Sequence, residues 1–218
     1  MYPTELDESS NILDSEAHLR DDLEEAIDHG ILVSKLAYFL AKEMNLSEEY
    51  CYSMAEAGLI HDIGKLKLGK FLYGRNKNAL VVEEMKYIRM HSSIGNRILK
   101  DYGYSDDVCK AVHHHHENYD GSGYPHNNKG EGIPLGARIL RICDVYATLI
   151  SDRRNRIAFD KETAIKLMIE EIKNFDMKIF LTFVSAVNME EFKEIDEFID
   201  YLNSKEYSWG NILHDGYY

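Results

Sequence analysis

The chain has 218 residues, of which 44% are hydrophobic and 29% are charged, and its formal net charge is −13. This length fits one large domain or two small ones, and the apolar content is high enough to bury a core, which excludes a disordered protein. The negative charge excludes a protein that grips long DNA or RNA through the phosphates. We favour one soluble domain.

The N-terminus and the cysteines indicate where the protein works. The acidic start MYPTELDESS lacks the basic and apolar regions of a signal peptide, and no stretch reaches the ~20 apolar residues of a membrane span. Cys51, Cys109 and Cys143 are odd in number and form no CxxC pair, so free thiols are expected. These features predict a cytoplasmic protein without a membrane partner.

Apolar residues recur every three or four positions along most of the chain, which contains only 3 prolines, and this predicts an all-α fold. Asn45 is expected to end the first helix, and Ser47 to be the N-cap of the second. The expected helices are 16–44 (one helix, or two abutting), 47 to about 61, 82–101, 106–116, 135–152, 160–174, 179–187 and 190–203. Residues 66–78 and 117–132 are expected to be loops, and residues 1–15 and 204–218 appendages.

Ten histidines suggest metal binding, because imidazole and carboxylate are the usual ligands of Fe, Mn and Zn. Four of them, His113–His116, form a run too deep in the chain to be a purification tag. His61 and Asp62 diverge by ~100° on a helix, so they could flank two ions with the aspartate as a bridge. Such a pair is weak support alone: His214 and Asp215 form a second one, which we interpret as chance.

The neighbours of this pair leave alternatives open. Lys65 lies within one turn, where its ammonium could hold a phosphate oxygen, or it is a solvated surface lysine. Glu25 and His29 are four residues apart, so they share a helix face and could bind one ion, or they decorate the surface. His91 taken alone is more often a packed or exposed residue than a ligand.

Two later segments strengthen the metal hypothesis. Residues 115–125 supply two adjacent imidazoles and then a glycine-rich loop, which permits close approach of the backbone to a ligand. Asp144 stands in an apolar helix, where burying an unpaired carboxylate is costly. A metal or a cationic partner would remove that cost.

Together these segments resemble the HD-GYP family over roughly residues 24–187. The motifs are Glu25-xxx-His29, His61-Asp62-Ile-Gly-Lys65, His91, His115-His116-Glu117, Asp120-Gly121-x-Gly123-Tyr124-Pro125, Ile133-Pro134-Leu135, Ala137-Arg138-Ile139 and Asp144. The resemblance implies an all-α HD-domain helical bundle with an extended HD-GYP helical core. Residues 24–188 would form this domain, preceded by an extension (1–23) and followed by a C-terminal helix and tail (189–218).

The resemblance also implies an activity. It is the metal-dependent hydrolysis of cyclic di-GMP to linear pGpG, GMP or both, by a metal-activated hydroxide, with two or three divalent ions, Fe or Mn. The expected metal ligands are His61, Asp62, His91, His115, His116 and Asp144, with Asp62 bridging and with Glu25 and His29 holding an optional third ion. Asp62 and Lys65 would be catalytic, and the substrate would contact Lys65, Asp120, Gly123, Tyr124, Pro125 and Arg138, with Lys65 neutralising the scissile phosphate and Arg138 adding a second cation.

The sequence departs from the family pattern at two places. Ala147 stands where family members commonly have a second aspartate three residues after the Asp144 position, and residues 69–81 replace the usual Lys-Pro-Gly loop. Two alternatives therefore stay open: a catalytically weak sensor or scaffold that binds a cyclic dinucleotide, and an HD hydrolase of a mixed cyclic dinucleotide or another nucleotide. The expected partners are the cyclic dinucleotide and either a second copy of the chain or a signalling protein.

Overall fold

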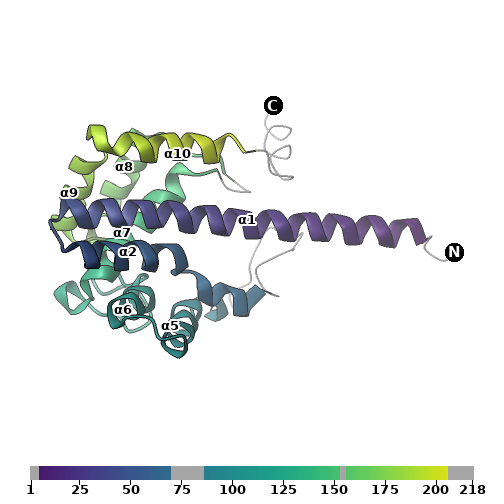
Figure 1. Cartoon of the computed structure of the whole chain (residues 1–218), viewed down its shortest axis with the longest axis horizontal. Helices are drawn as coiled ribbons and strands as arrows, with labels where there is room; N and C mark the ends of the chain where they lie inside the picture. Colours follow the sequence, from purple (N-terminus) through teal and green to yellow (C-terminus); the bar gives the residue numbers. More distant parts are fainter. Residues whose placement is uncertain (1–4, 70–85, 153–155, 206–218) are drawn as a thin grey trace.

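The computed structural model describes the backbone of residues 5–69, 86–152 and 156–205, with side chains from residue 19 onward. Helices dominate these ranges and no strand is formed within them, which confirms the predicted all-α fold (Figure 1). The α-helices are α1 (Glu5–Glu43), α2 (Glu48–Ile60), α5 (His91–Asp101), α6 (Asp106–His114), α7 (Leu135–Ile150), α8 (Lys161–Glu170), α9 (Met177–Ala186) and α10 (Lys193–Asn203). The short 3₁₀ helices are η1 (Ile63–Leu68), η2 (Gly130–Gly132), η3 (Ile172–Asn174) and η4 (Glu190–Phe192).

Helix α1 is longer than the sequence pattern predicts. It begins at Glu5 rather than at residue 16, so most of the expected N-terminal appendage is helical, and its first turns extend beyond the other helices (Figure 1). Residues 5–15 contain no glycine or proline, so nothing interrupts the helix there. The predicted stop is confirmed: Asn45 has φ 56°, a left-handed conformation that asparagine tolerates better than most residues.

Other boundaries differ by a few residues. The helix expected at 82–101 lies outside the described residues at its start, and Arg89 and Met90 form a turn before α5 begins at His91. Residues 66–68 of the loop expected at 66–78 belong to η1 instead, and residues 70–78 lie outside the described residues. The helix expected at 160–174 is α8 followed by η3. The predicted N-cap is confirmed, since Ser47 Oγ accepts a hydrogen bond from Tyr50 N at 3.3 Å.

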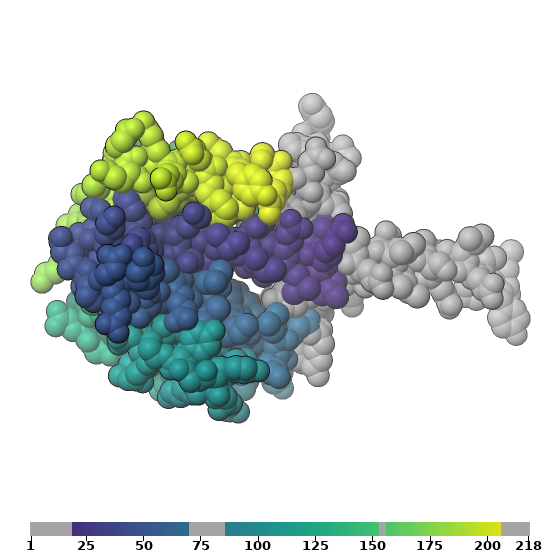
Figure 2. Space-filling view, in the orientation of Figure 1, coloured from purple at the N-terminus to yellow at the C-terminus, as the bar shows by residue number. Residues whose placement is uncertain are grey.

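Helix α1 packs against α2, α7, α9 and α10, and on the face shown in Figure 2 it is visible between α10 and α2. Three residues of α10, Ile195, Ile199 and Leu202, belong to the same hydrophobic core as α1 and α7. The C-terminal helix is therefore part of the main body. The predicted domain boundaries at residues 24 and 188 remain predictions. Within the described ranges, no helix combines the length and apolar character needed to cross a membrane.

A glycine allows α1 and α2 to cross closely. A Cβ atom at Gly58 would lie 2.8 Å from Ser34 N, so any larger residue would push the helices apart. The close approach places His61, at the C-terminal end of α2, beside His29 of α1, with ring centroids 5.2 Å apart. The packing of these helices thus brings together two histidines that are 32 positions apart in the sequence.

Candidate metal centre

The predicted ligands converge where several helices end. His61 follows α2, His91 opens α5 and His115 follows α6, and all three side chains are buried. Asp62, His91, His115 and His116 each offer a ligand atom within 4.8 Å of the others, and so do His29, His61 and Asp62. Asp62 belongs to both groups, which is the position that a bridging carboxylate requires.

The three buried imidazoles are held in one tautomer by the same local contact. The Nδ1 atoms of His61, His91 and His115 lie 2.7, 2.7 and 2.6 Å from the carbonyl oxygens of the residues three positions earlier. A carbonyl only accepts, so each Nδ1 carries the proton and each Nε2 presents its lone pair to the centre. Backbone orientation of this kind is the usual support of a metal-binding histidine.

Two atoms at the centre lack hydrogen bonds. Among the described residues, His61 Nε2 and Asp62 Oδ1 are buried polar atoms that form none. Leaving such atoms unpaired is costly, and native proteins rarely do so without a functional reason. Both are the ligand atoms expected of an ion-binding residue, so the donor set fits divalent metal ions bound between them.

Asp62 is surrounded by cationic or polarisable groups. Its Oδ2 lies 2.5 Å from Lys65 Nζ and 3.4 Å from His61 Nε2, and its Oδ1 lies 3.2 Å from His91 Nε2. Burial alone would raise the pKa of Asp62, but Lys65, His61 and His91 together hold it well below its usual value. The carboxylate therefore stays ionised and able to bind a cation.

Asp144 reaches the centre from the middle of α7. Its Oδ1 accepts a hydrogen bond from His29 Nε2 at 3.0 Å and lies 3.7 Å from His61 Nε2. Burial opposes ionisation, but the contacts with His29 and His61 hold the pKa of Asp144 well below its usual value. The partly buried carboxylate of Asp144 thus faces two imidazoles, and an ion could bind between them and the carboxylate.

His115 and His116 favour the neutral, metal-binding form. Burial is the main cause that lowers the pKa of His115 well below its usual value, and His116 adds to the effect. Burial also lowers the pKa of His116 to about 3, although Asp144 acts in the opposite direction. Both rings therefore carry free lone pairs at neutral pH.

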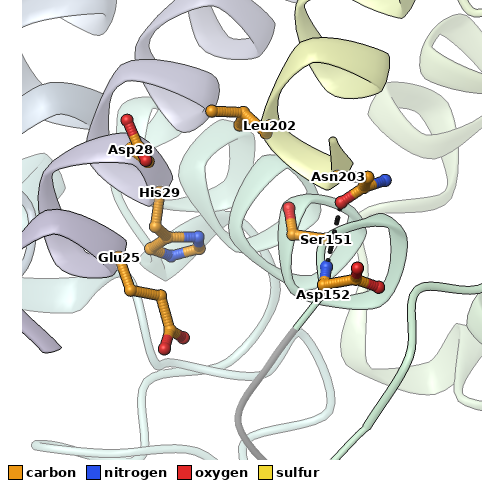
Figure 3. Close-up of a pocket in the computed structure, with 7 residues that line it drawn as sticks. All are labelled: Glu25, Asp28, His29, Ser151, Asp152, Leu202 and Asn203. Carbon is orange, nitrogen blue, oxygen red and sulfur yellow. Dashed lines mark hydrogen bonds between the residues drawn. The ribbon is translucent and has the colours of Figure 1, made fainter. Parts of the chain in front are cut away.

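The structure places the two residues predicted for a third ion differently. Glu25 and His29 project from successive turns of α1 and line a small pocket with Ser151, Asp152 and Asn203 (Figure 3). Only His29 belongs to a group of converging ligand atoms. Glu25 lies beside that group on the pocket wall.

Tyr124 lies against the metal centre. Its ring stacks on His116, with centroids 4.7 Å apart and an interplanar angle of 26°, and the guanidinium carbon of Arg89 lies 5.4 Å from its ring centroid. The preceding Gly123 leaves no room for a side chain, because a Cβ atom there would lie 2.2 Å from Asn118 N and 2.4 Å from His116 O. The loop residues 123–125 therefore form a fixed wall next to the ligands.

Two of the residues predicted to contact substrate are engaged elsewhere. Asp120 Oδ1 accepts hydrogen bonds from the backbone N and the hydroxyl of Ser122, at 2.9 and 2.6 Å, and so shapes its own turn. Arg138 donates to Asp176 Oδ2 at 2.6 Å, an acidic residue at the N-cap of α9. Neither contact brings the side chain to the ligand groups.

Sequence reasoning missed Arg141, and it names Glu117 only as part of the His115-His116-Glu117 motif, without a role. Arg141 lies one turn before Asp144, the i, i+3 spacing that could have revealed it, and donates to Asn118 Oδ1 at 3.0 Å. Burial lowers its pKa, whereas Asp144 and Tyr124 act in the opposite direction. The buried Glu117 accepts hydrogen bonds from His126 N at 2.8 Å and Asn128 N at 3.1 Å, which fixes the loop after Pro125.

Known proteins are similar to this chain in sequence or in fold. The model of the HD domain family matches residues 9–179. The chain is 34% identical to the Pseudomonas aeruginosa protein "Cyclic di-GMP phosphodiesterase PA4108" over 82% of this chain and 43% of that protein. It is 30% identical to the Vibrio cholerae "3'3'-cGAMP-specific phosphodiesterase 1" over 78% of this chain and 38% of that protein.

A solved structure supports the fold assignment. Bd1817, described as an HDG"Y"P protein from Bdellovibrio bacteriovorus, superposes with a TM-score of 0.60 at 18% identity, over 75% of this chain and 53% of that one. The chain spans about two fifths of the length of the two curated relatives. From the family match, the relatives and the Gly-Tyr-Pro loop beside the ligands, the chain belongs to the HD domain family and is of the HD-GYP type.

Proposed function

We propose that this chain is a metal-dependent phosphodiesterase that hydrolyses cyclic di-GMP to linear pGpG, GMP or both. The observation that carries the proposal is the group of inward-facing imidazole lone pairs around Asp62, in which His61 Nε2 and Asp62 Oδ1 form no hydrogen bond. The adjacent Lys65 supplies a cation at the position where a phosphate would meet the ions. The names of the curated relatives support a cyclic dinucleotide as substrate.

The proposed ligands are His61, Asp62, His91, His115, His116 and Asp144, with Asp62 between two ions. This mixture of imidazole and carboxylate suits Fe or Mn. We assign His29 to a third ion, and we assign Glu25 to the same ion because it lines the same pocket one helical turn earlier. When bound, the ions would supply Lewis acidity and a water of lowered pKa for attack on the phosphorus.

The protein side chains would orient the substrate and balance its charge. Lys65, with its side chain 32% exposed, can turn from Asp62 toward a nonbridging phosphate oxygen and stabilise the charge that develops there. Tyr124, stacked on His116, presents an aromatic edge and face beside the centre for a nucleobase or ribose. Arg141 adds positive charge near Asp144 and Tyr124, the role that the sequence assigned to Arg138.

A mixed cyclic dinucleotide is the second candidate substrate, because one relative is specific for 3'3'-cGAMP. The ligand groups recognise metal and phosphate and do not select the base. The proposed place of work is the cytoplasm, where the three buried free cysteines would stay reduced. A second copy of the chain or a signalling protein is the proposed protein partner.

The test is anaerobic turnover of cyclic di-GMP and 3'3'-cGAMP by Fe-loaded and Mn-loaded protein, with products separated by chromatography. We expect Asp62→Asn to abolish turnover and Asp101→Asn, an exposed acid at the end of α5, to retain it. Full turnover by metal-loaded Asp62→Asn would refute the mechanism. If the wild type binds cyclic di-GMP tightly but does not hydrolyse it, the chain is a sensor and not an enzyme.

A further inference from the structure

A second group of histidines lies outside the proposed metal centre. His113 and His114 belong to the last turn of α6, and His126 comes from the loop that follows Pro125. The ring centroids of His113 and His114 are 4.6 Å apart, and that of His126 lies 5.1 and 5.3 Å from them. One ring nitrogen from each residue lies within 4.8 Å of the other two. Two separate segments thus bring three potential ligands together.

The polar neighbours of these rings form only long contacts. His114 Nδ1 lies 3.5 Å from Asn128 Nδ2 and 3.6 Å from Glu117 Oε1. His113 contacts Ser93 Oγ at 3.3 Å and Asn96 Nδ2 at 3.2 Å. These distances are at or beyond the upper end of ordinary hydrogen bonds, so an ion could replace them at small cost.

The types of ligand at this site indicate which metal ion would bind there. Three imidazoles with a fourth position open to water or a carboxylate are a common zinc environment. The buried Glu117 carboxylate lies beside His114, with its Oε1 3.6 Å from His114 Nδ1, and could contribute an oxygen. Neutral imidazoles bind Zn²⁺ much better than Mg²⁺ or Ca²⁺, which prefer oxygen. We propose that His113, His114 and His126 form a separate divalent-metal site that is selective for Zn²⁺.

An ion at this site would connect the loop to α6. His126 follows Pro125 directly, and Tyr124 of the same loop stacks on His116. The site shares no ligand with either group that contains Asp62. Zinc would therefore link the loop of residues 117–132 to α6, at a site next to the proposed metal centre and separate from it.

The first experiment measures zinc directly. The Mn-loaded 218-residue chain is equilibrated with Zn²⁺, passed through a gel-filtration column and analysed for metals. The wild type is compared with His126→Ala, His126→Cys and Asp62→Asn. His126 is exposed, so its replacement spares the core. We expect His126→Ala to retain one zinc fewer per chain than the wild type, and His126→Cys to recover it because thiolate is a zinc ligand.

Asp62→Asn separates this site from the metal centre. We expect this variant to lose ions from the centre and to keep the zinc that depends on His126. Equal zinc content in the wild type and His126→Ala would overturn the proposal, as would loss of that zinc in Asp62→Asn. Because metal content is measured without turnover, failure here leaves the proposed phosphodiesterase activity untouched, and the reverse also holds.

Hydrogen exchange gives a second readout. Zinc should slow amide exchange in residues 117–132 of the wild type and of His126→Cys, because the ion joins two segments. It should leave exchange in His126→Ala unchanged. Equal slowing in all three proteins would show that zinc acts elsewhere.

Discussion

The two oxygens of Asp62 face different surroundings. Oδ2 is paired with Lys65 Nζ at 2.5 Å, whereas Oδ1 forms no hydrogen bond and faces His91 Nε2 at 3.2 Å. One oxygen is thus balanced by a protein cation, and the other is available to an ion. This asymmetry separates the role of Lys65 from that of the ligands, and it can be tested by changing Lys65 alone.

Lys65→Ala should strongly reduce turnover and leave the ions bound. Loss of the ammonium removes a charge that stabilises the phosphate in the transition state, and we expect kcat to fall about 10²-fold to 10³-fold. Metal content should not fall, because the lysine repels cations. Kinetics and metal analysis on the same sample check both parts, with Lys67→Ala, an exposed lysine two residues on, as the control. If Lys65→Ala loses its ions as Asp62→Asn does, Lys65 positions Asp62 instead.

Tyr124 should act through its ring. Burial raises the pKa of its hydroxyl, and Asp62 and Asp144 add to the effect, so the group stays protonated and cannot serve as a base at neutral pH. The ring stacks on His116, and a nucleobase stacked on an aromatic side chain gains roughly 1–3 kcal/mol. We expect Tyr124→Phe to keep the wild-type KM and Tyr124→Ala to raise it about tenfold. A large fall in kcat for Tyr124→Phe would show that the hydroxyl takes part.

At the scale of elements, the end of α10 and the residues just after it connect the middle of α1 with the end of α7. Asn203 Nδ2 donates to Ile150 O at 2.9 Å, and Asn203 Oδ1 accepts from Asp152 N at 3.0 Å. Lys205 Nζ reaches Asp28 Oδ2 of α1 at 2.5 Å. These contacts surround the pocket that contains His29 (Figure 3). The C-terminal helix therefore supports the wall of the candidate third-ion site.

Asn203→Ala should destabilise the protein by about 1–2 kcal/mol, because it removes two hydrogen bonds at the end of α7. Asn188→Ala is the matched control: it removes one exposed hydrogen bond, from Asn188 Nδ2 to Val184 O, and should cost less. Urea unfolding of both metal-free variants measures the difference. Equal midpoints for the two would show that α10 does not depend on this contact.

The helices were predictable from local pattern because apolar periodicity and caps act within a few residues. Ser47 and Asn45 define the junction of α1 and α2, as the sequence predicts. The ligands were predictable as residue types, since a motif shows which side chains can bind metal. Their convergence depends on helix crossings such as the one at Gly58, which the chain shows only when folded.

Which arginine lies near the metal centre could not be predicted from the sequence. Arg138 and Arg141 lie on one helix, and the motif suggested the first. The structure pairs Arg138 with Asp176, which is 38 positions away, and leaves Arg141 near Asp144. No local pattern reports that distant pairing, because it depends on how α9 docks against α7. Long-range contacts of this kind also account for the integration of α10 into the core.

At the scale of the whole molecule, a run of histidines with lowered pKa values should make stability depend on pH. Burial is the main cause for His113, whose pKa is lowered to about 4, for His116 at about 3, and for His114 and His115. Each stays neutral in the folded state but is protonated in the unfolded state below about pH 6.5. Their stabilising contribution is therefore complete above pH 6.5 and is lost as the pH falls toward the folded values.

Other groups of the centre act differently. Burial lowers the pKa of His61, but Asp62 and Asp144 outweigh it and raise the pKa overall. The stabilising contribution of His61 is therefore present at low pH and is lost as the pH rises, opposite to that of the other histidines. Asp62 and Asp144 have lowered pKa values, so they lose their contribution only below about pH 4. Between pH 6.5 and pH 4, the change in the free energy of unfolding therefore comes mainly from the histidines that are neutral in the folded protein.

The metal-free protein should become less stable as the pH falls from 7 to 5, by at most roughly 1.4 kcal/mol per pH unit for each uncompensated histidine. Urea midpoints measured at half-unit steps test this. His116→Asn removes one titrating group, so its slope should be smaller by about one proton, whereas Asn188→Ala should keep the wild-type slope. In the metal-bound protein, stability should fall more steeply as the pH decreases, because protons compete with metal for the same imidazoles. A midpoint that is constant from pH 7 to 5 would mean that these rings take up protons equally well in the folded chain, which is incompatible with their burial around a metal centre.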